Sequence, residues 1–216
     1  MGNSSLSCMR VISPNKNSPR NHTIDTITIH CTGGQGSVET LCSLFQINGA
    51  SCNYAIGSDG RICTIVDEAD RSWCSSSAAN DNRAVTIECS SDDFYPYAIS
   101  ASVWKSLVEL CADICKRNGI KQLVWSTDQK TRMDHLNGCN MTVHRDYANN
   151  GSTAQSALQA RLCFPCSQLY YPFPNFRKFP APLSLAGAVR WCRPLQVCSV
   201  NHSIDTPSTL ASTVNS

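Results

Sequence analysis

Residues 23–30, TIDTITIH, alternate β-branched and polar side chains, and this period of two predicts a strand that ends at His30. A second stretch, RAVTIECS at 83–90, is almost continuously apolar and predicts a buried strand that carries one acid, Glu88. A third stretch, NMTVH at 140–144, predicts a further strand that ends in His144. Strand ends present side chains at one rim of a sheet, where α/β proteins commonly build their sites.

Helical and hairpin patterns lie between these strands. Residues 37–45 and 99–120 carry apolar side chains at helical spacing, and the second segment ends at an Asn-Gly cap. Residues 52–66 predict a hairpin around an Asp-Gly turn, and residues 121–126 predict another strand. Strands that alternate with helices indicate an α/β fold, in which helices pack against a sheet.

Composition restricts the class of protein. The 216 residues are 42% hydrophobic and 16% charged, which is compatible with a globular protein. A net charge of +2 gives no reason to expect nucleic acid or an acidic membrane as partner. The N-terminus lacks a basic stretch followed by an apolar run, so we expect no signal peptide, and no run is long enough to cross a bilayer.

Fourteen cysteines are many for a chain of this length. A disulfide framework is one explanation, but it is typical of shorter secreted domains. Cys111 and Cys115 lie one helical turn apart, while Cys52, Cys63 and Cys89 fall in apolar strand-like runs as small hydrophobic residues. We therefore favour mostly free thiols in a reducing setting over disulfides.

The sequence changes character near residue 150. Residues 1–150 contain 13 of the 18 basic and 15 of the 16 acidic residues, whereas residues 151–216 contain seven of the ten prolines and have no periodic pattern. We expect an N-terminal extension at 1–20, a catalytic domain at 21–150 and a Pro- and aromatic-rich tail at 151–216. The tail is an extended arm, a disordered segment or the product of a frameshift.

Three residues are candidates for a functional site. A single histidine at a strand end is more often structural than a ligand, and a buried glutamate is as often a structural partner as a functional group. His30, His144 and Glu88 all lie on predicted strands of one sheet, however. Their combination favours a site, because a carboxylate on an apolar strand is costly unless it is paired or used.

Four segments in register resemble a known family. DTITIHCTGGQ, CNYAIGSDGRI, NRAVTIECSSD and MTVHRDYAN, spread over about residues 20–150, resemble the zinc-dependent N-acetylmuramoyl-L-alanine amidases, which include phage endolysins and peptidoglycan recognition proteins. The stretch that contains DRSWCSSS looks most like phage-type lysins. The resemblance implies a mixed central β-sheet flanked by helices. It also implies hydrolysis of the peptidoglycan amide bond between N-acetylmuramic acid and L-alanine.

The same resemblance implies roles for individual residues. His30 and His144 correspond to ligands of Zn²⁺, and Glu88 corresponds to the general base that activates the zinc-bound water. Asn53 and Tyr54 belong to the hairpin motif and, with Trp73, are candidate substrate-binding residues. Packing is the alternative for Tyr54 and Trp73.

The chain departs from the family after His144. Asn150 stands where the family has a lysine, and Ser152 stands where it has a cysteine or aspartate as third ligand. A serine hydroxyl is a poor zinc ligand, so Cys163 or Cys166 is a possible substitute. The alternatives are a non-catalytic peptidoglycan-binding module, an inactive amidase or a frameshift near codon 150. A cysteine-nucleophile hydrolase is a weaker alternative, because no cysteine lies in a nucleophile motif.

The resemblance also suggests where the protein acts. We expect a monomer whose partner is bacterial peptidoglycan, with no nucleic acid partner and no membrane insertion. Like phage lysins, it would accumulate in the cytoplasm without a signal peptide and act on the cell wall after release.

Overall fold

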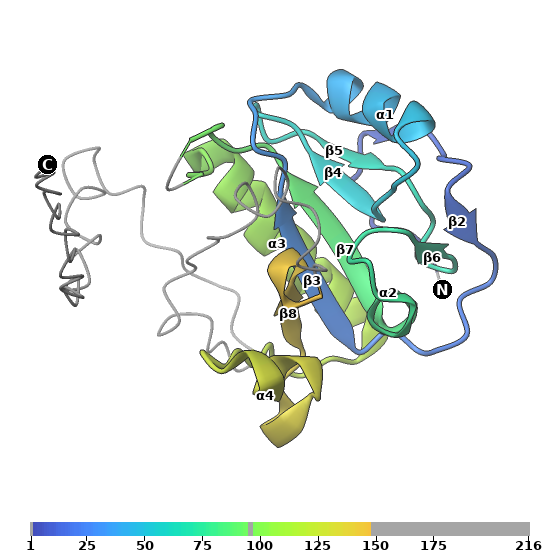
Figure 1. Cartoon of the computed structure of the whole chain (residues 1–216). Helices are drawn as coiled ribbons and strands as arrows, with labels where there is room; N and C mark the ends of the chain where they lie inside the picture. Colours follow the sequence, from blue (N-terminus) through green and yellow to red (C-terminus); the bar gives the residue numbers. More distant parts are fainter. Residues whose placement is uncertain (1, 95–96, 148–216) are drawn as a thin grey trace, which may run out of the picture. The chain divides into compact units, whose positions relative to one another are not determined.

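A computed structural model describes residues 2–94 and 97–147, and its centre is a six-stranded sheet in the order β1-β5-β4-β7-β3-β8 (Figure 1). The strands are β1 (Met9–Arg10), β3 (Thr26–Cys31), β4 (Tyr54–Ile56), β5 (Ile62–Thr64), β7 (Ala84–Cys89) and β8 (Met141–Val143). Only the β4–β5 pair of this sheet is antiparallel, so the sheet is mixed, as the resemblance implied. A smaller antiparallel sheet pairs β2 (Lys16–Asn17) with β6 (Arg71–Ser72).

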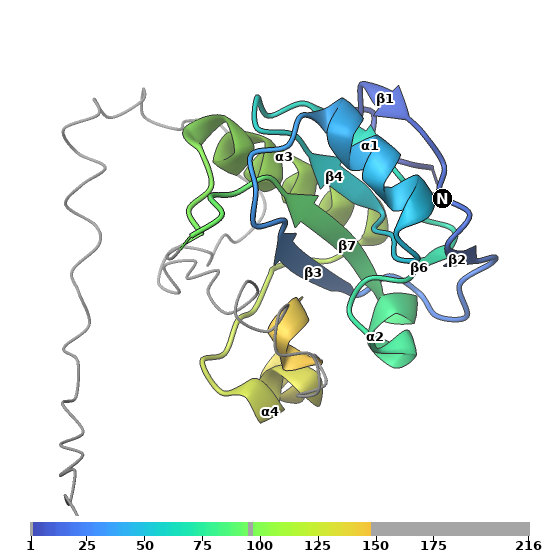
Figure 2. The same ribbon diagram turned by 45° about the horizontal axis from the view of Figure 1, so that its top comes forward.

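Two long helices, α1 (Val38–Ile47) and α3 (Ala101–Asn118), lie on opposite faces of the main sheet (Figures 1 and 2). The apolar side of α3 packs in a core cluster that contains Ile56 of β4, whereas α1 packs in a second cluster that contains the neighbouring Ala55. Successive side chains of a strand point to opposite faces, which explains why the sheet is apolar on both sides.

Both long helices agree with the predicted ranges 37–45 and 99–120 to within two residues at each end. The Ser37 side chain accepts a hydrogen bond from the Thr40 amide, and Ser100 accepts one from the Val103 amide. Gly119 ends α3 with a φ of 70°, in the left-handed region that favours glycine. Two short helices were not predicted: α2 (Ala78–Arg83) and α4 (Gln129–Met133).

The predicted strand at 121–126 is wrong, because this segment has no regular secondary structure. The segment is held to the fold by hydrogen bonds with Asn140. The Val124 carbonyl accepts from the main-chain N–H of Asn140, and the main-chain N–H of Val124 donates to the side-chain oxygen of Asn140 at 2.8 Å. The main chain and the side chain of Asn140 thus together bind the two main-chain groups of Val124 that a strand partner would otherwise pair. The other predicted strands, the hairpin and both helices are confirmed within a few residues.

Residues 2–20 are part of the folded unit. β1 pairs with β5 in parallel, so that Met9 faces Cys63, and β2 pairs with β6. Ser4 and Ser13 are buried. The expected tail at 151–216, including Ser152, Cys163 and Cys166, lies outside the described residues, and the boundary near 150 stays a prediction.

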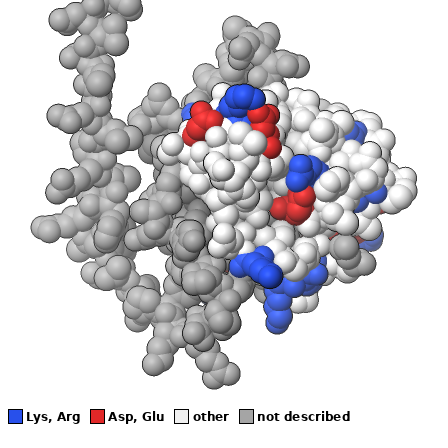
Figure 3. Space-filling view, turned by 90° about the horizontal axis from the view of Figure 1, so that it is seen from below, with Lys and Arg blue, Asp and Glu red and all other residues white. Residues whose placement is uncertain are grey.

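The described cysteines include one disulfide, between Cys42 and Cys63, and no other disulfide joins cysteines within residues 2–94 and 97–147. No helix in this described part is both long and apolar enough to cross a bilayer. On the face shown in Figure 3, acidic side chains lie beside basic ones, and several basic side chains stand apart at the lower edge.

Candidate metal centre

Strand register brings the three predicted site residues together. β3 and β7 run parallel with His30 directly opposite Glu88. β8 pairs with the other edge of β3 up to Val143, and His144 is the next residue along the chain. The carboxyl ends of three adjacent parallel strands therefore carry one histidine, one glutamate and a second histidine, at the rim where α/β sheets place their sites.

The two histidine rings meet edge to face. Their centroids are 4.9 Å apart, and the Nδ1 atoms of His30 and His144 are 3.1 Å apart. Glu88 Oε1 lies 3.6 Å from His30 Nδ1. Zinc–nitrogen bonds of about 2.0–2.1 Å place two ligand nitrogens of a tetrahedral ion roughly 3.3 Å apart. The two Nδ1 atoms fit such an ion.

The protonation states also suit a metal. Burial lowers the pKa of His30 well below 6.5, and the neighbouring His144 lowers it further. Burial likewise lowers the pKa of His144, although Asp81 and a main-chain hydrogen bond to Cys74 oppose this shift. Both imidazoles are therefore neutral at neutral pH, which is the form that binds metal ions. Burial also raises the pKa of Glu88 to about 8.

A buried ion pair holds the turn that carries His144. The 3₁₀ turn His144–Asp146 follows β8, and Asp146 accepts a hydrogen bond from the Val143 amide at 3.0 Å. Arg132 of α4 binds both oxygens of Asp146, at 2.9 and 2.5 Å, and stacks on the Trp125 ring. Because this bidentate pair is almost completely buried, it fixes the turn and thereby the position of His144.

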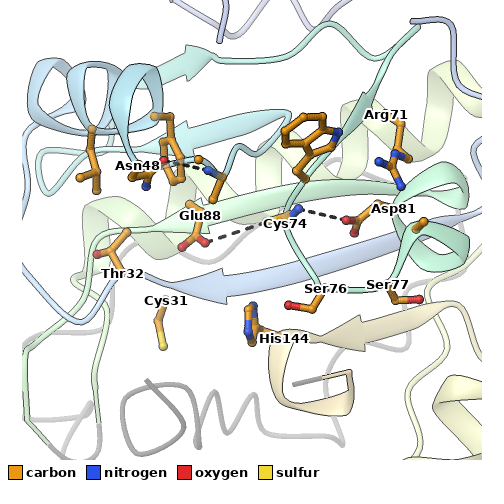
Figure 4. Close-up of a pocket in the computed structure, with 16 residues that line it drawn as sticks. Cys31, Thr32, Asn48, Arg71, Cys74, Ser76, Ser77, Asp81, Glu88 and His144 are labelled. Atoms are coloured by element: carbon orange, nitrogen blue, oxygen red, sulfur yellow. Dashed lines mark hydrogen bonds between the residues drawn. The ribbon is translucent and has the colours of Figure 1, made fainter. Parts of the chain in front are cut away.

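Cys74 belongs to the site but was missed in the sequence. It lies in the loop between β6 and α2, with its Sγ 3.3 Å from His30 Nε2. The same sulfur lies 3.9 Å from Glu88 Oε1 (Figure 4). His30, Cys74 and Glu88 can each offer one donor atom within 4.8 Å of the others. The available signal was weak: Cys74 directly follows Trp73, in a stretch noted only for its likeness to phage lysins.

A cavity of about 670 Å³ opens beside these residues. Glu88 and His144 line it, together with Trp73, whose exposed fraction is 40%. Cys31, which strand alternation predicts to face away from His30, also lines this cavity (Figure 4). A volume of this size is typical of pockets that bind small ligands.

The structure does not bring Asn53 or Tyr54 to the cavity, which corrects the expectation that they contact substrate. Both are fully buried. The Asn53 amide group donates to main-chain carbonyls, and its oxygen accepts from the Thr86 amide at 3.1 Å. The Tyr54 hydroxyl donates to Glu68 at 2.5 Å. These hydrogen bonds make both residues part of the core.

Comparison with solved structures finds the same fold in AmpD, and two further structures are similar at lower scores. A selenomethionine derivative of AmpD is 16% identical to the chain, with a TM-score of 0.50, and the alignment covers 70% of this chain and 88% of AmpD. The Staphylococcus aureus hydrolase AmiA, in complex with its ligand, is 16% identical with a TM-score of 0.48 and coverage of 68% of both chains. The endolysin amidase LysCS of Clostridium intestinale is 15% identical, with a TM-score of 0.47 and coverage of 68% and 87%.

Comparison of sequences gives the family. No curated protein matches the chain. A family model described as N-acetylmuramoyl-L-alanine amidase matches residues 20–157, which is more than half of the 216 residues. This segment contains both strand-end histidines, Glu88 and the cavity. The chain therefore belongs to the N-acetylmuramoyl-L-alanine amidase family.

Proposed function

We propose that this protein hydrolyses the peptidoglycan amide bond between N-acetylmuramic acid and L-alanine, with Zn²⁺ bound by His30 and His144 and with Glu88 as general base. One observation carries the proposal: the Nδ1 atoms of two neutral imidazoles, the buried His30 and the half-buried His144, are 3.1 Å apart, and the Glu88 carboxylate lies beside His30. Membership of the amidase family supports a peptidoglycan hydrolase of this class.

The metal would be bound by the Nδ1 atoms of the two histidines. A bound Zn²⁺ supplies an activated water and polarises the amide carbonyl. His30 is 3% exposed, so its ring is held by the surrounding protein and not by water. Among the sequence candidates for a third ligand, Cys163 and Cys166 offer a thiolate and suit zinc better than Ser152.

Glu88 is suited to move a proton. Its side chain is 15% exposed and lines the cavity, so its carboxylate reaches a bound substrate. Because its pKa is raised to about 8, both the protonated and the ionised form of Glu88 are accessible near neutral pH, as a group that accepts and then donates a proton requires. Glu88 would take a proton from the attacking water and return it to the leaving amine of alanine.

The cavity suits a glycopeptide. Trp73 presents an exposed aromatic face and is a candidate platform for a sugar or peptide group. Arg71, whose side chain donates to Asn17, also lines the cavity and provides a positive charge. We infer that the stem peptide or the glycan lies along this side, and that the protein acts as a monomer on the cell wall after release, as endolysins do.

A non-catalytic peptidoglycan-binding module is the second candidate. The departures at Asn150 and Ser152 favour it, because the family has a lysine and a third ligand there. Both candidates use the same cavity. They differ in whether the centre holds zinc tightly and releases product.

Zinc content and turnover on purified peptidoglycan separate the two candidates. Full-length protein with one equivalent of zinc is expected to release soluble muropeptides, and Glu88→Gln is expected to keep its zinc while it loses this release. Sedimentation of the protein with cell walls, without any products and with far less than one equivalent of zinc, would favour the binding module.

A further inference from the structure

Cys74 contacts both histidines of the candidate metal centre. Its Sγ is 3.3 Å from His30 Nε2, the ring nitrogen opposite the one that faces His144. Its main chain hydrogen-bonds the ring of His144. Figure 4 shows the residue between Glu88 and Asp81, at the edge of the cavity. Cys74 therefore contacts both rings, and its sulfur lies beside the Nε2 atom of His30 and not between the two Nδ1 atoms.

The loop around Cys74 is held by buried hydrogen bonds. The Asp81 carboxylate, 2% exposed, accepts from the Cys74 amide at 3.0 Å and from the Ser75 amide and hydroxyl at 3.2 and 2.6 Å. On the other side, the main chain of Trp73 exchanges two hydrogen bonds with Ser51. The main chain of Cys74 is therefore fixed by the protein itself, and its sulfur has a defined position.

The chemistry of a neutral imidazole assigns a role to this sulfur. Such a ring has one N–H donor and one lone pair. The His30 lone pair belongs on Nδ1, which faces both His144 and Glu88, so the proton belongs on Nε2. Because the ring is 3% exposed, this N–H needs an acceptor from the protein, and Cys74 Sγ is at a suitable distance.

We propose that Cys74 is a positioning residue whose sulfur accepts the Nε2–H of His30 and keeps the Nδ1 lone pair directed at the metal, without binding the metal itself. This inference rests on the proposed function, because it assumes a metal between the two Nδ1 atoms. Partners of this kind set the tautomer and orientation of ligand histidines, and their removal lowers metal affinity about 10–100-fold.

A competing arrangement uses the same sulfur as a ligand. His30 Nε2, Cys74 and Glu88 would then bind the ion. One imidazole cannot present both nitrogens to the same ion, so this arrangement would leave Nδ1 and His144 unused. It would also remove Glu88 from its role as base. The position of His144 Nδ1, 3.1 Å from His30 Nδ1, argues for the first arrangement.

The test compares metal binding by full-length wild type, Cys74→Val and Cys74→Ser. Valine has a similar size but no acceptor, so the zinc dissociation constant is expected to rise 10–100-fold, whereas serine keeps an acceptor and is expected to lose less. Cys8→Ser removes an exposed thiol away from the site and serves as control. Nitrogen NMR of the zinc-loaded wild type is expected to find the metal on Nδ1 of His30 and the proton on Nε2.

Two results would overturn the inference. A thiolate-to-cobalt absorption band of the cobalt-loaded protein that disappears in Cys74→Ser would make the sulfur a ligand. Unchanged zinc affinity in a folded Cys74→Val would leave the sulfur without a role. If Cys74→Val does not fold, the NMR and cobalt spectra decide. Zinc on Nδ1 without any release of muropeptides would contradict the proposed function but not this inference.

Discussion

A fully buried glutamate, Glu68, and a half-buried one, Glu88, occupy very different environments. The side chain of Glu68 is fully buried, and its oxygens accept hydrogen bonds from Arg117 at 2.6 and 2.8 Å and from the Tyr54 hydroxyl. Glu88 lies beside a neutral histidine and a thiol, and it faces a cavity. Both carboxylates lose hydration on folding, but only Glu68 forms an ion pair, with Arg117, that compensates for this loss.

The difference separates a structural acid from a functional one. Glu68 joins the N-terminal segment and the hairpin to α3, and its hydrogen-bonding capacity is used within the protein. Burial without a cation raises the pKa of Glu88 to about 8 and leaves its oxygens available to a substrate or to water. A carboxylate kept in this state at a cavity is a strong candidate for proton transfer.

The largest effect is expected from Glu88→Gln. Glutamine keeps the shape of the side chain but cannot take a proton, so turnover should fall about 10²–10⁴-fold, as measured by release of soluble muropeptides. Glu109→Gln, on the exposed side of α3, is the matched control and should keep full turnover. Turnover of Glu88→Gln within tenfold of wild type would show that another group is the base.

A large loss of stability is expected from Arg117→Met. This change leaves Glu68 buried without its cation, which should lower the free energy of unfolding by about 3–5 kcal/mol in urea titrations. Lys105→Met breaks an exposed pair on the same helix and should cost less than about 1 kcal/mol. Equal losses of stability in the two variants would show that Glu68 does not depend on its cation, and the contrast with Glu88 would then fail.

A moderate effect is expected from Arg132→Met. Asp146 would lose its bidentate partner, and the turn that carries His144 would no longer be fixed. Zinc affinity, measured by competition with a chelator, should fall about 10-fold or more. Lys130→Met breaks an exposed ion pair with Asp134, the residue that caps the C-terminus of α4, and should bind zinc like wild type. Wild-type affinity in Arg132→Met would show that the ion pair does not position His144.

The smallest effect concerns the pH dependence of stability without metal. The pKa of Glu88 is raised from 4.5 to about 8, so the unfolded state releases this proton at lower pH than the folded state does. Stability conferred by the protonated carboxyl is therefore complete below pH 4.5 and is lost as the pH rises towards 8. Thermal unfolding of metal-free Glu88→Gln should show a growing advantage over wild type across this range. A constant difference would contradict the raised pKa.

The strands and their histidines were predictable, because short-range patterns determine them. The alternation in 23–30 and the apolar run in 83–90 predict β3 and β7, and the parallel register then brings His30 opposite Glu88. The burial of Tyr54 was not predictable, because it depends on a hydrogen bond with Glu68, which is fourteen residues away in the sequence. A motif position alone does not tell whether a side chain faces the cavity or the core.

Cys74 could not be placed for a similar reason. Its distance from His30 depends on the Asp81 carboxylate, which fastens a loop without periodic pattern to the sheet. The strand predicted at 121–126 failed because a single asparagine, Asn140, takes the place of a pairing strand. In both cases a tertiary hydrogen bond overrides the local pattern.

The identity of the bond that is cut tests the central claim most directly. Purified peptidoglycan digested by the zinc-loaded full-length protein can be labelled at newly formed amino groups and hydrolysed to identify the labelled residue. The proposed function predicts new N-terminal L-alanine in proportion to soluble product, and no new reducing sugar. New reducing ends, or another N-terminal residue, would contradict it.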